Sequence, residues 1–169
     1  DGQAFVAYYS AAQLSGTSAP SAPVWETIIP NGMSGKAVRE LPGDNAGFIA
    51  GVAGMEGEAP FLVKLSSSGN IEWQRAYPNH GELTDVAVLS ENAQLQGFAI
   101  VGHRSAETGG IDGSVTKVSP DGDVLWEVSV GNPVGGTGPF AGLGAGNPQL
   151  IFDEPSGYCN QRSAYKLII

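Results

Sequence analysis

Three tryptophans recur in matching contexts, and this internal repeat constrains the fold more than any other feature. Trp25, Trp73 and Trp126 each follow an isoleucine or valine by one or two positions, and they are separated by 48 and then 53 residues. Residues 64–73 align with 117–126 without a gap, and the two segments share lysine, serine, glycine and tryptophan at the same places. A period of about 50 residues indicates a unit that buries its faces against copies of itself.

The repeat extends in both directions from these segments. A Gly-Phe motif followed by small and apolar residues occupies 47–51 and again 97–102, and Gln149–Phe152 falls at the same phase. At the amino-terminal end, residues 5–10 take the place of residues 61–66. A lysine recurs in each later unit, at Lys64, Lys117 and Lys166.

Each unit divides into four short strands, because its apolar runs are short and bounded by turn formers. In the best-preserved unit the predicted strands are 84–89, 97–102, 114–118 and 124–130. Gly69 and Gly122 lie in the turns between strands three and four, where glycine supplies a positive φ. No segment has a helical period, so the sequence predicts an all-β chain of four-stranded antiparallel repeats.

Antiparallel four-stranded repeats of this length are typical of β-propeller blades. We expect a partial blade with strands three and four at 1–30, whole blades at 31–77 and 78–130, and a partial blade with strands one to three at 131–169. Propellers close with about 4 to 8 blades, so this chain predicts an incomplete ring. We therefore expect either a fragment of a longer polypeptide or a ring completed by a second copy or another protein.

The Gly-aromatic-apolar-apolar-x-Gly motif and the Lys-x-Ser-x-x-Gly-x-x-x-Trp motif resemble the blades of secreted PQQ-like and kelch-like β-propellers. The resemblance covers residues 31–130. The Asp-box of sialidase-like propellers is not matched, because in residues 119–126 the glycine stands one place early, and the threonine typical of quinoprotein dehydrogenases is missing. The resemblance thus implies a fold and leaves the activity open.

Composition excludes several classes of partner. Seventeen acidic and eight basic side chains give a net charge of −9, which repels nucleic acid and anionic lipid. No apolar stretch is long enough to span a bilayer, so we expect no membrane insertion. The single cysteine, Cys159, excludes an internal disulfide and reads as an unpaired loop thiol.

The repeat places the chemically versatile side chains on one face. Loops from strand two to three and from strand four to the next strand one share a face in a propeller, and this is the predicted ligand face. Its candidate residues are Glu56, Glu58, His80, Glu82, His103, Arg104, Glu107, Asp112 and Arg162, with Cys159 beside them. The repeated residues Trp25, Trp73, Trp126, Lys64, Lys117 and Lys166 are expected to be structural, the tryptophans covering the gap between blades and the lysines pairing with an acid such as Asp112 or reaching solvent.

The two histidines are expected to be solvated loop residues rather than a shared metal site, because no His-x-His or Asp-x-Asp-x-Asp spacing occurs. We expect no catalytic residue, no cofactor and no metal, with a structural calcium ion as an open alternative. The expected function is a non-catalytic binding or scaffolding module within a larger assembly, in an extracellular, periplasmic or organelle-lumen setting. The alternative is a carbohydrate-active hydrolase or lyase on the loop face.

Overall fold

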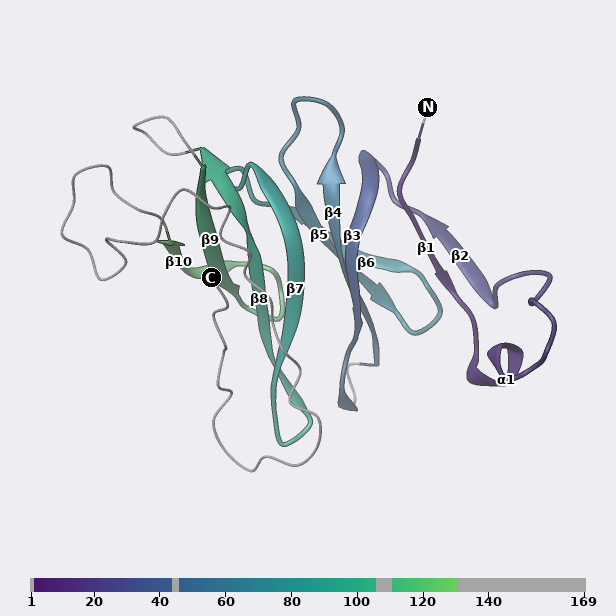
Figure 1. Cartoon of the computed structure of the whole chain (residues 1–169). Coiled ribbons are helices and arrows are strands. Elements are labelled where there is room, and N and C mark those ends of the chain that lie inside the picture. Colours follow the sequence, from purple (N-terminus) through teal and green to yellow (C-terminus); the bar gives the residue numbers. More distant parts are fainter. Residues whose placement is uncertain (1, 44–45, 106–110, 131–169) are drawn as a thin grey trace.

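The computed structural model describes residues 2–43, 46–105 and 111–130, and these form an all-β structure of three antiparallel sheets (Figure 1). The first sheet pairs β1 (Phe5–Tyr8) with β2 (Trp25–Ile28). The second holds β3 (Gly32–Glu40), β4 (Gly47–Gly54), β5 (Phe61–Ser66) and β6 (Ile71–Ala76). The third holds β7 (Glu82–Glu91), β8 (Gln94–Ser105), β9 (Ile111–Val118) and β10 (Val124–Val130). The prediction of an all-β fold is confirmed.

Both four-stranded sheets are meanders in which each strand pairs with the next along the chain. Gly69 and Gly122 close the β5–β6 and β9–β10 turns with φ of 83° and 86°, as the sequence predicted. The β7–β8 turn instead uses Asn92 and Ala93 at positive φ. The partial blade predicted at 131–169, with Lys166, lies outside the described residues.

One helical turn was not predicted. Ser10 caps α1 (Ala11–Leu14) in a capping box with Gln13, whose side chain accepts a hydrogen bond from the Ser10 backbone. The helix is only four residues long and buries no side chain. It occupies the connection between β1 and β2.

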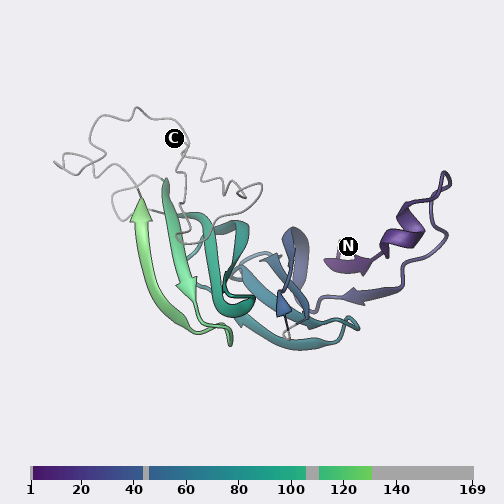
Figure 2. The ribbon, with the colours of Figure 1, turned by 90° about the horizontal axis from the view of Figure 1, so that it is seen from below.

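The sheets stack face to face in chain order (Figure 2). Between the second and third sheets, Ile49 and Leu62 meet Val86, Phe98 and Ile100 in a core of fully buried side chains. On its other face the second sheet buries further side chains against Ala4 and Ile29, which flank the first sheet. Each sheet is thus stabilised through its neighbours, because a single meander has two apolar faces and cannot cover either one itself.

The same side-chain arrangement joins each pair of neighbouring sheets. Trp25 of β2 lies edge-on to Phe48 of β4, with ring centroids 5.4 Å apart, and Trp73 of β6 lies edge-on to Phe98 of β8 at 6.1 Å. The turn glycine of the following sheet lies directly beneath each indole, Gly69 under Trp25 and Gly122 under Trp73. The third repeated tryptophan, Trp126, is 49% exposed.

Candidate functional site

Three of the predicted acids line one groove. Glu56 and Glu58 of the β4–β5 loop line it together with Gly81 and Glu82. The groove has a volume of about 340 Å³, and Met33 and Met55 are exposed along it. The β4–β5 loop and the start of β7 therefore border one groove, and acidic side chains from both line it.

A short chain of charged groups fixes Glu82 in this groove. The Lys36 ammonium donates to Glu82 Oε1 at 2.7 Å, and His103 Nε2 lies 3.7 Å from Glu82 Oε2. The hydrogen bond from Lys36 holds the pKa of Glu82 below its ordinary value, and the charges of Lys36 and His103 act in the same direction. Glu82 is therefore a carboxylate at neutral pH. Sequence reasoning missed Lys36, which comes from β3 in the preceding repeat and carries no motif of its own.

His80 is buried, and the prediction that both histidines are solvated is wrong for it. Its ring is 3% exposed, with Nε2 2.8 Å from Thr116 Oγ1 and Nδ1 2.8 Å from Ser114 Oγ. Burial lowers the pKa of His80 below its ordinary value, so the ring is neutral at pH 7. Ser114 and Thr116 occupy the places that Phe61 and Val63 hold in the second sheet, so a polar network replaces an apolar contact.

A second ion pair, between β8 and β10, lies near His80. Arg104 Nη1 donates to Glu127 Oε1 at 3.1 Å, and Asn79 Nδ2 donates to Glu127 Oε2. Asp112 lies opposite Arg104 in the β8–β9 ladder. Glu107, Cys159 and Arg162 lie outside the described residues. The described part of the predicted face thus contains polar groups around Glu82 and around Glu127.

The repeated lysines differ in what they contact. Lys64 pairs with an acid, as expected, and that acid is Glu72 of β6, 3.0 Å away across the β5–β6 hairpin. Lys117 lies opposite Trp126 in the β9–β10 ladder, as Lys64 lies opposite Trp73. These positions are equivalent in the two sheets, as the gapless sequence alignment requires.

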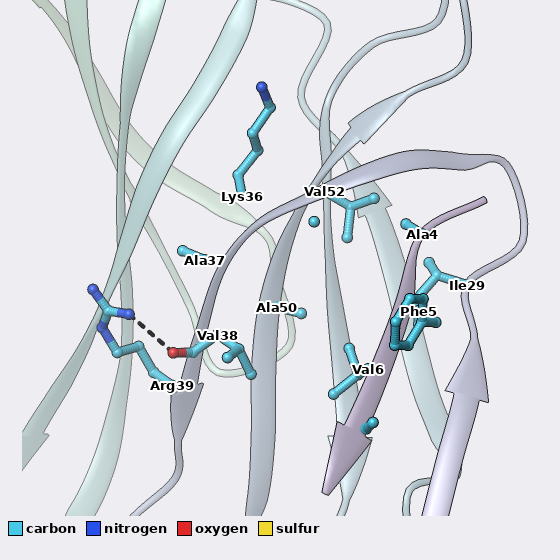
Figure 3. Close-up of a pocket in the computed structure, with 12 residues that line it drawn as sticks. Ala4, Phe5, Val6, Ile29, Lys36, Ala37, Val38, Arg39, Ala50 and Val52 are labelled. Carbon is cyan, nitrogen blue, oxygen red and sulfur yellow. Dashed lines mark hydrogen bonds between the residues drawn. The ribbon is translucent and has the colours of Figure 1, made fainter. Parts of the chain in front are cut away.

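A larger hollow of about 450 Å³ separates β1 from β3 and β4 (Figure 3). Phe5 lies on the β1 side and Val38 on the β3 side, and Ala50 and Val52 come from β4. Arg39, which also contributes to the lining, turns toward β7 and binds Asp85 through two hydrogen bonds. No sequence motif indicated this hollow, because it lies where a two-stranded sheet meets a four-stranded one.

The described residues contain no group of three His, Cys, Asp or Glu side chains placed to hold a metal ion. Across the described ranges no helix is long and apolar enough to cross a membrane. Ser114, the hydroxyl beside His80, is fully buried and has no access to a substrate. What the groove offers to a ligand is therefore a set of carboxylates beside exposed methionine side chains.

Comparison of the chain with models of protein families, with curated proteins and with solved structures found no match.

Proposed function

We propose that the chain is a non-catalytic binding or scaffolding module, built of propeller-type blades, that works as a subunit of a larger protein assembly. The observation that carries the proposal is a pair of equivalent valines. Val38 lies opposite the residue that is two places after Phe48, and Val86 lies opposite the residue that is two places after Phe98. The two valines therefore hold the same position in the second and third sheets. Val86 is fully buried between two four-stranded sheets, whereas Val38 faces the two-stranded sheet and is 49% exposed.

The third sheet, the last one in the described residues, supports the same proposal. Trp126, Leu125 and Val128 are all exposed on β10, while Trp73 packs against Phe98 of the following sheet. Exposed apolar side chains that cluster on one strand are typical of surfaces that bind another protein. In an assembly, neighbouring subunits would cover these exposed apolar faces. Its acidic charge and the resemblance to secreted propellers favour an extracellular, periplasmic or lumenal setting.

The proposal is tested by native mass spectrometry of the tagged protein, purified from its source under mild conditions. We expect a complex of defined stoichiometry that the Trp126→Ser or Val38→Asp variant weakens while circular dichroism stays unchanged. The Leu14→Asp variant is the control, because Leu14 is exposed on α1 away from both surfaces. A chain that remains monomeric at every concentration, without a bound partner, would refute the proposal.

One observation favours a second candidate, a carbohydrate-active hydrolase or lyase. Glu56, Glu58 and Glu82 line a single groove, and glycoside hydrolysis uses two carboxyl groups facing each other across a cleft. Turnover of a polysaccharide panel, abolished by Glu58→Gln or Glu82→Gln and unaffected by Glu91→Gln, would establish this activity. The absence of turnover with every polysaccharide would count against it.

A further inference from the structure

Among the described residues, the strand β1 has one unpaired edge. Within this part of the chain it pairs with β2 alone, and the Val24 N–H donates to the Tyr8 carbonyl at one end of this ladder. Backbone groups alternate between the two edges of a strand, so the N–H and C=O groups of Phe5 and Ala7 point away from β2. This edge lies on the side of β3, since β1 runs between β2 and β3 (Figure 1). Phe5, Val6 and Ala7 of β1 line the 450 Å³ hollow.

In the second sheet, the equivalent edge is covered by a neighbouring strand. Phe61 of β5 occupies the position of Phe5, since each lies opposite the residue three places after the repeated tryptophan. Phe61 and Val63 pair with Val52 and Ala50 of β4, and Phe61 is 7% exposed. Phe5, which has no such neighbour among the described residues, is 59% exposed. A strand beside β1 would therefore cover Phe5 and satisfy its backbone.

One strand would not suffice to cover Val38. Its counterpart Val86 is buried because both β3 and β4 pack against β7. The equivalent cover for Val38 is a pair of strands, the first hydrogen-bonded to β1 and the second lying farther along β3. Of the hairpins in the described residues, β3–β4 and β7–β8 are already paired within their own sheets, so neither can fill this place.

The lining of the hollow selects for an apolar occupant. Gly35, Ala37 and Ala50 are small and allow close approach of a backbone. The two charged lining residues, Lys36 and Arg39, are already bound to Glu82 and Asp85 of β7. A free polar ligand would find its partners engaged, whereas an apolar face loses water against Phe5 and Val38.

We propose that the free edge of β1 binds a β-hairpin of a partner protein. This hairpin is apolar on the side that faces the hollow and carries a net positive charge. The inference rests on the proposed binding function and names its partner. Strand addition supplies affinity through backbone hydrogen bonds and specificity through alternate side chains. The chain has a net charge of −9, so a second copy is repelled and a basic partner is attracted.

A peptide of residues 32–54 serves as the probe, because it contains the hairpin that covers the equivalent edge of β5. Titration calorimetry measures its binding to the full chain, and hydrogen exchange followed by NMR reads the amides of β1. We expect saturable binding that slows exchange of the Phe5 and Ala7 amides, while Val6, already paired with β2, changes little. A peptide with three added lysines binds more tightly at low salt, and this advantage disappears at high salt.

Two substitutions distinguish pairing along the strand edge from nonspecific hydrophobic binding. Ala50→Pro in the peptide removes one N–H on the edge that meets β1, and about a tenfold loss of affinity is expected. Val38→Asp in the protein places a charge in the hollow and should weaken binding at least as much. Val38→Ile keeps binding, and Leu14→Asp is the matched control for an added charge elsewhere.

Several results would overturn the inference. These are the absence of saturable binding, equal binding of the Ala50→Pro peptide, or binding unaffected by Val38→Asp. Slow exchange of Phe5 and Ala7 in the free protein at all concentrations would mean that this chain covers its own edge. Slow exchange that appears only as the protein concentration rises would identify a second copy. A chain that assembles but ignores the peptide would refute this inference alone, whereas a monomer without any partner would refute the proposed function.

Discussion

Replacing Gly69 with alanine tests whether the contact between the repeated tryptophan and the turn glycine holds neighbouring sheets together. A Cβ atom at Gly69 would lie 2.6 Å from Cδ2 and Cε3 of Trp25. Carbon atoms pack at about 3.5–4.0 Å, so the indole must move by roughly 1 Å. Tyr8 stacks on this ring at 5.7 Å, Phe48 lies edge-on at 5.4 Å, and Nε1 donates to the Ser67 carbonyl. The ring therefore has little freedom to move.

Gly57 provides a matched control for the backbone part of the cost. Its φ of 84° equals that of Gly69 within a degree, but a Cβ atom there meets no atom within 4 Å. An L-residue in this left-handed region costs about 1–2 kcal/mol, and overpacking adds about 1–3 kcal/mol. We expect Gly57→Ala to lower the free energy of unfolding by about 1–2 kcal/mol and Gly69→Ala by about 2–5 kcal/mol.

Urea denaturation followed by circular dichroism and tryptophan fluorescence measures both values. A double variant with Trp25→Leu and Gly69→Ala should show coupling, because the smaller side chain leaves room for the new methyl group. Equal losses for Gly57→Ala and Gly69→Ala, or strict additivity in the double variant, would refute the assigned role of this contact.

Three further predictions follow from burial. Val86→Ala should cost about 2–3 kcal/mol because two buried carbons are lost and a cavity remains, whereas Val38→Ala should cost less than about 1 kcal/mol; thermal unfolding of both compares them. In the unfolded chain His80 takes up a proton near pH 6.5, whereas in the folded chain its pKa is lower. The free energy of unfolding should therefore fall as pH drops below about 6.5, by at most about 1.4 kcal/mol per pH unit. Urea titrations at several pH values should show this slope and its loss in His80→Asn. Tyr77→Phe should cost about 0.5–1.5 kcal/mol, because the buried phenol donates to the Gly122 carbonyl, and an unchanged urea midpoint would contradict this.

Much of the strand arrangement follows from local sequence rules. Alternation of short apolar runs with turn formers placed β7 to β10 within a few residues of their observed ends, and Gly69 and Gly122 marked their turns. Gapless alignment of 64–73 with 117–126 required equivalent positions for Lys64 and Lys117, which both lie opposite a tryptophan. These features depend on contacts within one hairpin, and a repeat displays them twice.

The candidate site was only partly readable in this way. Glu56, Glu58 and Glu82 were expected on one face, and all three line one groove. The sequence did not reveal that Lys36 binds Glu82, since the two residues are 46 positions apart and meet only when two sheets stack. Nor did it distinguish buried His80 from half-exposed His103, because burial depends on Ser114 and Thr116 of a strand that follows much later.

The sequence by itself determined the antiparallel hairpins, their turns and the repeat, because these arise from backbone preferences and side-chain alternation over a few residues. Only the tertiary structure decided which copies of a repeated residue are buried. Val38 and Val86 are the same amino acid at the same register, yet one is exposed and the other enclosed. Their difference lies in the neighbouring sheet, which has two strands in one case and four in the other. Burial depends on what lies across an interface, and no local pattern contains that information.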